Sequence, residues 1–243
     1  MRALRQLLFI SLLFATTSPG ATIGIAQLGG YVHANGSLHA QLDGSAGSFF
    51  TTLDADNLGT FGWTFTNTSG TALSNLYFLV FLDADIDRDL NTFFNEYGEF
   101  GSLALPPSAI LGSIAASSWE IDEPGFLFGN IVTNLFAGVL ENSNGVPSSA
   151  PDDASLALGF FLAQLSPGQS LTVRMSISRT DIGGLRQVDP DSDFQFYFNG
   201  AAEVTNGGPS PIPEPSTFAL MISGVVAALV VSRSGSGRKG STR

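Results

Sequence analysis

Several stretches between residues 27 and 208 alternate apolar residues with small or polar ones, which is the pattern of half-buried β-strands. The clearest stretches are residues 61–66, 171–178 and 194–198. Residues 76–82 instead form a continuous apolar run, which predicts a strand buried on both faces. The run 157–165 is also apolar and fits either a strand or a short helix.

Turn-forming clusters separate these runs, such as Asn67-Thr68-Ser69-Gly70 and Ser166-Pro167-Gly168-Gln169. No segment shows a convincing helical period, and no internal repeat appears. The pattern therefore predicts an all-β fold, an antiparallel β-sandwich of immunoglobulin-like or jelly-roll type. The strand-turn-strand segment 64–83 is similar to immunoglobulin-like accessory modules of bacterial surface proteins, in which such a turn joins neighbouring strands.

The N-terminus, residues 1–26, has the three parts of a secretory signal peptide. Arg2 and Arg5 precede an apolar stretch over residues 7–14, which is too short to span a membrane. Gly24-Ile25-Ala26 offers a cleavage site with small residues at positions −3 and −1. Cleavage after Ala21 is the alternative, although it places Pro19 at position −3. We therefore predict an exported protein with a secreted domain over residues 27–208.

The C-terminal residues 209–243 also form a three-part pattern. The tripeptide Pro213-Glu214-Pro215 comes first, and residues 216–232 then form a short apolar span predicted to be a single transmembrane helix. A basic tail follows, with Arg233, Arg238 and Lys239. Because positive residues favour the cytoplasmic side, this tail places the domain outside the inner membrane.

This order of parts resembles the PEP-CTERM sorting signal of exported bacterial proteins. The resemblance implies that a membrane exosortase recognises the segment and cleaves near Pro213-Glu214-Pro215. The precursor would be anchored transiently in the inner membrane, and its domain would then reach the cell surface or the medium. The family typically occurs in bacteria that make extracellular polysaccharide, which makes such a polysaccharide a candidate partner. In this chemistry the protein is a substrate and not the catalyst.

Charge and composition exclude several classes of function. Of the ten Lys and Arg residues only four lie within residues 22–212, together with twenty of the twenty-one Asp and Glu residues, so this part has a net charge of −16. Such a surface does not suit nucleic acid, whose phosphates require clustered cations. The chain has no cysteine, which excludes disulfides, a thiolate zinc site and a cysteine nucleophile.

One acidic run is the best candidate for a metal site, and it consists of Asp83, Asp85, Asp87 and Asp89. In a loop, four carboxylates at alternate positions could surround Ca²⁺, which prefers six to eight oxygen ligands. The run does not match an EF-hand loop, because Arg88 and Phe94 stand where Gly and Glu are required. Glu96 or Glu99 could supply a later ligand. The alternative is a solvated acidic loop.

A second run, Asp189-Pro190-Asp191-Ser192-Asp193, has the same spacing, but its proline favours a turn. Asp152-Asp153 is interpreted as a loop or a helix N-cap. The two histidines, His33 and His39, match no metal motif and are expected on strand faces. No nucleophile elbow, phosphate-binding loop or dinucleotide fingerprint is present, so we do not expect an enzyme.

These observations support three hypotheses. The first is a non-enzymatic cell-envelope or extracellular-matrix protein, sorted by an exosortase and associated with exopolysaccharide or biofilm. The second is a calcium-dependent carbohydrate-binding or adhesion module, which requires exposed aromatic side chains beside residues 83–89. Most aromatic residues are expected in the core, because they suit buried pleated surfaces. The third, ranked below these, is a secreted glycan hydrolase, which requires two carboxylates facing each other across a groove.

Overall fold

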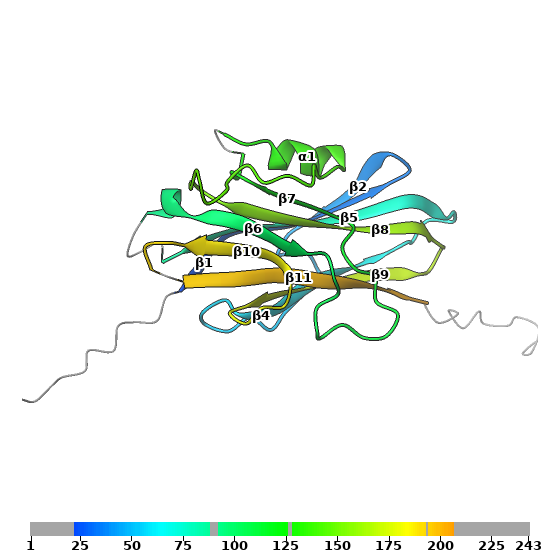
Figure 1. Ribbon diagram of the computed structural model, residues 1–243. Coiled ribbons are helices and arrows are strands. Elements are labelled where there is room, and N and C mark those ends of the chain that lie inside the picture. Colours follow the sequence, from blue (N-terminus) through cyan, green and yellow to red (C-terminus); the bar gives the residue numbers. More distant parts are fainter. Residues whose placement is uncertain (1–21, 88–91, 126–127, 193, 207–243) are drawn as a thin grey trace, which may run out of the picture. The chain divides into compact units, whose positions relative to one another are not determined.

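The computed structural model describes residues 22–87, 92–125, 128–192 and 194–206. Within them the chain forms two antiparallel sheets that pack face to face (Figure 1). Sheet A contains, in spatial order, β2 (Ser37–Leu42), β1 (Ile23–Ala34), β5 (Leu73–Ile86), β8 (Ser155–Leu165) and β7 (Ser118–Asp122). Sheet B contains β3 (Phe49–Thr51), β4 (Gly59–Thr66), β9 (Ser170–Ser178), β11 (Phe194–Thr205), β10 (Gly184–Asp189) and β6 (Tyr97–Ser102).

The all-β sandwich is thus confirmed, and the finer immunoglobulin-like or jelly-roll grouping stays a prediction. The strands predicted from alternation correspond to β4, β9 and β11, and the ambiguous run 157–165 lies in β8. Two short helices, the 3-10 helix η1 (Phe93–Asn95) and α1 (Ile131–Ala137), were not expected. The seven residues of α1 are too few to show a helical period, and only Ile131 and Leu135 among them are buried.

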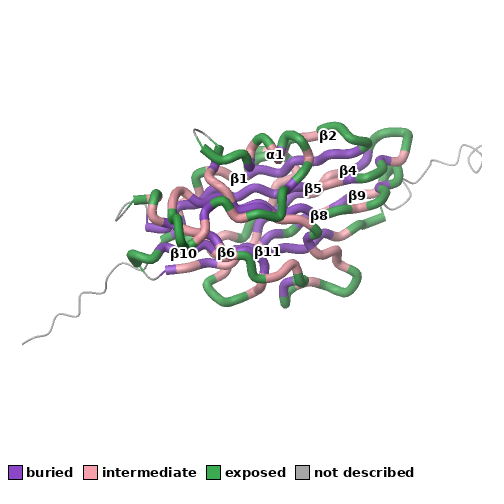
Figure 2. Tube along the Cα trace, turned by 45° about the horizontal axis from the view of Figure 1, so that its top comes forward, coloured by how far each residue is buried: buried purple, intermediate pink, exposed green. Residues whose placement is uncertain are grey.

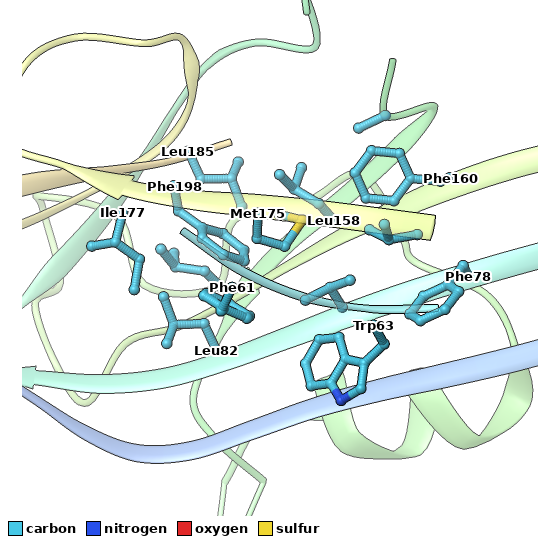
Figure 3. Packing of buried hydrophobic residues seen from close by; sticks show 14 of the residues in the cluster. Phe61, Trp63, Phe78, Leu82, Leu158, Phe160, Met175, Ile177, Leu185 and Phe198 are labelled. Carbon is cyan, nitrogen blue, oxygen red and sulfur yellow. The ribbon is translucent and has the colours of Figure 1, made fainter. Parts of the chain in front are cut away.

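The core lies between the two sheets and is rich in aromatic side chains (Figure 3). Trp63 and Phe61 from β4 are fully buried, and their rings meet edge to face with centroids 5.7 Å apart. The indole N–H of Trp63 donates to the carbonyl oxygen of Asp43 at 2.9 Å, so that burial leaves this polar group satisfied. Gly62, between the two aromatic residues, faces the backbone of β9, where a Cβ would lie 2.0 Å from the carbonyl oxygen of Val173.

The central strand β5 is buried on both faces, as its continuous apolar run predicts. Alternate residues such as Phe78 and Leu82 face sheet B, whereas Leu79 and Phe81 face outward and pack beneath α1. Figure 2 shows buried residues following the strands and exposed residues gathering in the loops. The same outward face of β5 continues, beyond Phe81, into the acidic run.

The turn over residues 67–70 does not join neighbouring strands, so the hairpin predicted for residues 64–83 is wrong. The strand before it, β4, lies in sheet B, and the strand after it, β5, lies in sheet A. The buried Asn67 holds this crossing, because its side-chain amide donates to the carbonyl oxygens of Thr71 and Leu165, both at 2.9 Å. A turn signal marks where the chain bends and does not specify which sheet receives the next strand.

Strand β1 begins at Ile23, so four of its residues fall within the range predicted as signal peptide. At the other end, β11 finishes at Thr205, and the compact unit of the sandwich finishes with it. The predicted sorting signal, including Pro213-Glu214-Pro215, the span 216–232 and the basic tail, lies outside the described residues. Among the residues that are described, no helix has the length and apolar character needed to cross a membrane.

Candidate functional site

Acidic side chains gather at one end of the sandwich. Strands β5, β7 and β10 finish there, and β1, β6, β8 and β11 begin there. We call it the acidic end and define it by Asp83, Asp85, Asp87, Glu96, Asp122, Glu123, Asp152, Asp153, Asp189 and Asp191. These residues come from strand termini and adjoining loops that are distant in sequence, and strand pairing assembles them.

Three of these carboxylates form a tight group. Asp83 and Asp85 lie on the outward face of β5, and Asp153 lies just before β8. One carboxylate oxygen from each residue lies within 4.8 Å of the other two. The register explains the meeting, since Asp83 pairs with Ser155, and two residues further along these antiparallel strands Asp85 approaches Asp153.

Two of its three carboxylates are buried, which distinguishes the group from a solvated acidic loop. Asp83 is 3% exposed and Asp85 is 4% exposed. Burial is the largest cause that raises the pKa of Asp153 to about 7, and the nearby charges of Asp83 and Asp85 raise it further. Carboxylates placed so close together favour either a shared proton or a bound cation.

Asp87, the next aspartate of the predicted calcium run, is not part of this group. Asp87 follows the end of β5 in a left-handed conformation with φ 55°, and its Oδ1 accepts the backbone N–H of Thr22 at 2.8 Å. This turn of the backbone directs Asp87 toward the start of β1 and away from Asp153. Asp89 lies outside the described residues. The structure thus supplies Asp153 as the third carboxylate beside Asp83 and Asp85.

The carboxyl of Glu96 lies near both acidic runs, close to Asp85 of the first and Asp189 of the second. It is fully buried, and its Oε1 accepts the backbone N–H of Ile86, whereas its Oε2 accepts from the side-chain amide of Gln187. Burial is the main cause that raises its pKa to about 9, and the charges of Asp85 and Asp189 raise it further. At neutral pH the Glu96 carboxyl is therefore protonated and links sheet A to sheet B as a neutral group. Glu99, the other candidate for a later ligand, instead forms a salt bridge with Arg186.

The second acidic run folds as the turn between β10 and β11, as its proline predicts. Asp189 is fully buried, and its Oδ1 accepts the backbone N–H of Asp191 at 2.8 Å. Its Oδ2 accepts the hydroxyl of Ser192 at 2.7 Å. Asn95 donates its side-chain amide to both Asp189 and Asp191. This hydrogen bonding holds a turn, and Asp193 lies outside the described residues.

A cavity of about 270 Å³ opens beside the three-carboxylate group. Its lining consists of Phe93, Phe94, Glu123, Pro124, Gly125, Phe128 and Asp153. Phe94 is 58% exposed and Phe128 is 69% exposed, which makes them the two most exposed phenylalanines among the described residues. Asp153 therefore belongs both to the carboxylate group and to the wall of an aromatic cavity.

The site offers carboxylates and aromatic side chains to a ligand. A glycosidase needs two carboxylates that both reach the scissile bond. Asp83 and Asp85 are too deeply buried to contact a saccharide, so the two carboxylates that hydrolysis would require could only be Asp153 and Glu123, which both line the cavity. A cation held by the three carboxylates could instead support a ligand in the cavity, because calcium accepts mixed oxygen ligands.

The two histidines lie on strands, as expected. His33 in β1 is buried, and its Nε2–H donates to the carbonyl oxygen of Leu135 in α1 at 2.8 Å. His39 lies exposed in β2. Neither is part of the acidic end.

Comparison with protein-family models, curated proteins and solved structures finds no match to this chain.

Proposed function

We propose that this chain is an exported cell-envelope or extracellular-matrix protein whose C-terminal segment is a sorting signal for an exosortase. The observation that supports this proposal is where the compact body ends. The last strand and the compact unit both finish at Thr205, before Pro213 and every other residue of the predicted signal. Cleavage near Pro213-Glu214-Pro215 would therefore release the whole sandwich without cutting a strand.

The proposed role of the released body is non-enzymatic, in association with extracellular polysaccharide. Its precursor would be held in the inner membrane through residues 216–232 and would then move to the cell surface or the medium. The net charge of −16 between residues 22 and 212 keeps such a body soluble and limits nonspecific attachment to anionic surfaces.

Intact mass measurements test the sorting proposal. The mature protein is purified from cells with an exosortase and from otherwise identical cells that lack it. We expect the chain to end near Pro213 only when the exosortase is present. Replacing Glu214 with Ala should block this cleavage, whereas replacing Ser210 with Ala, outside the motif, should not. A C-terminal span that remains in both kinds of cell would refute the proposal.

A second candidate function is calcium-dependent carbohydrate binding at the acidic end. The specific observation in its favour is that Asp153 joins Asp83 and Asp85 and also lines the cavity that carries Phe94 and Phe128. Aromatic faces stack on sugar rings, and calcium could link the carboxylates to sugar hydroxyls. Calcium would also offset the mutual repulsion of the three neighbouring carboxylates, two of which are buried.

Thermal unfolding of the body, residues 22–206, tests this second function. At a calcium concentration 100 times its dissociation constant, binding stabilises the folded state by about 2.7 kcal/mol, or roughly 5–10 °C in a domain of this size. Asp85→Asn should abolish the shift, and Asp56→Asn, an exposed loop position, should retain it. Phe128→Ala should keep the calcium shift and lose binding to glycans. Identical melting in calcium and in chelator would exclude the site.

A further inference from the structure

The first residues of β1 are integral to sheet A. Ile23, Gly24 and Ile25 pair with Ile86, Asp85 and Ala84 of β5, in antiparallel register. The partner strand on the other side, β2, pairs only from Gly30 onward. Residues 23–28 of β1 therefore cover the edge of β5 along the acidic end.

The side chains and carbonyl groups of the same segment also make contacts within the sandwich. Ile23 is 2% exposed and belongs to the main core. Its carbonyl oxygen accepts the side-chain amide of Asn57 at 2.7 Å. The preceding residue, Thr22, forms two hydrogen bonds with Asp87. The Asp87 backbone N–H donates to the Thr22 carbonyl oxygen at 2.9 Å, and the Thr22 backbone N–H donates to Asp87 Oδ1 at 2.8 Å.

Cleavage after Ala26 would remove all of these contacts from the mature protein. It would remove Ile23, Gly24 and Ile25 from beside the last buried residues of β5, and buried backbone groups that lose their partners are costly. It would also open the core where Ile23 now lies. A signal peptide is cut before the exported chain folds, so whatever is removed is unavailable to the sheet.

We infer that signal peptidase cuts between Ala21 and Thr22, and that the mature N-terminus forms an ion pair with Asp87. This inference rests on the proposed export. Ala21 supplies the small residue before the cut. Hydrolysis adds one water across the Ala21–Thr22 peptide bond, leaving a carboxylate on Ala21 and an ammonium on Thr22. The Thr22 nitrogen already lies 2.8 Å from Asp87 Oδ1, a side chain that is 4% exposed, so the new positive charge arises beside a buried carboxylate.

The ion pair between the Thr22 ammonium and Asp87 gives the acidic end a positive charge, and positively charged side chains are few in this body. Only four arginines and no lysine lie between residues 22 and 212. Cleavage would thus add a positive charge beside Asp87 and also release the chain from its signal peptide. Cleavage after Ala26 would instead place the ammonium on Gln27, away from Asp87 along β1.

The test uses the full-length precursor in a Gram-negative host, with intact mass and N-terminal sequencing of the exported protein. We expect Thr22 to be the first residue, whereas a chain that begins at Gln27 would overturn the inference and leave export intact. A cell-associated chain that still begins at Met1 would refute export itself. Ala21→Gln should reduce processing at least tenfold, and Ala26→Gln, at an exposed position, should leave it unchanged. The reverse pattern would also overturn the inference.

A deletion provides a readout that does not depend on the protease's preference. Removing residues 22–26 from the precursor keeps the leader and joins it directly to Gln27. We expect the exported, protease-resistant body to accumulate at least tenfold less than the wild type. Equal accumulation together with an equal urea midpoint would show that the first residues of β1 are dispensable, and the inference would fail.

Discussion

The buried carboxyl of Glu96 makes the stability of the sandwich depend on pH in a direction that can be measured. Its pKa is raised from an ordinary value of 4.5 to about 9, mainly by burial. Between these values the folded protein holds a proton on Glu96 that the unfolded chain has released. Folding therefore takes up a proton, and this contribution to stability is complete below pH 4.5 and is lost as the pH rises toward 9.

The replacement Glu96→Gln isolates this effect because glutamine has nearly the same shape and cannot ionise. Each pH unit within the interval changes the free energy of unfolding by about 1.4 kcal/mol for one proton. Between about pH 5.5 and about pH 8.5, the variant should therefore gain about 4 kcal/mol relative to the wild type. At the acidic limit the variant should be less stable than the wild type by about 1–3 kcal/mol, because its side-chain NH2 replaces one of the two oxygens that accept from Ile86 and Gln187, and this offset does not depend on pH.

Urea unfolding of residues 22–206 at several pH values, with a chelator present, measures this difference. The fluorescence of the buried Trp63 reports the transition. Glu203→Gln removes a carboxyl near the opposite end of β11 and controls for the loss of one acidic group. If the stabilities of Glu96→Gln and wild type run parallel across the pH range, the carboxyl is ionised in the folded state and the reasoning is wrong.

Three further substitutions test the packing. Gly62→Ala should lower the free energy of unfolding in urea by about 3 kcal/mol, because the added Cβ would meet the carbonyl oxygen of Val173. Gly70→Ala is the control: an added Cβ there has no atom within 4 Å, so the free energy of unfolding should change by less than about 0.5 kcal/mol. Ile23→Ala should cost about 2–4 kcal/mol in the same assay, and a negligible effect would show that the start of β1 is not part of the core. Asn67→Ala should cost about 1–3 kcal/mol, because the Leu165 and Thr71 carbonyls lose the bonds from its side-chain amide; a wild-type midpoint would contradict this role.

The existence of the strands was predictable from the sequence, because a strand with one buried face must alternate apolar and polar residues. Alternation located β4, β9 and β11, and the continuous apolar run located the doubly covered β5. Pairing was not predictable from the same pattern. The chain crosses from sheet B to sheet A at Asn67, and that choice depends on contacts with Leu165, which is distant in sequence.

The candidate site was predictable only in part, for the same reason. Asp83 and Asp85 stand out as alternating acids after a buried strand, and the structure keeps them together. Asp153 could not be assigned to them without the antiparallel register of β5 and β8. Asp87 departs from the pattern because the strand ends before it and the backbone turns. The signals at the two ends of the chain, and calcium itself, stay predictions.

The direction of β11 has a consequence for how the body is displayed. The strand begins at the acidic end and finishes at Thr205, on the opposite side of the sandwich (Figure 1). From the first to the last of its twelve residues the strand spans roughly 36 Å, since each step between neighbouring residues advances about 3.3 Å. Any tether attached through the C-terminal segment therefore joins the body at the end of β11 that is opposite to the acidic end. In the tethered precursor that we propose, the acidic end and the aromatic cavity would lie at the other end of β11 from the point of attachment.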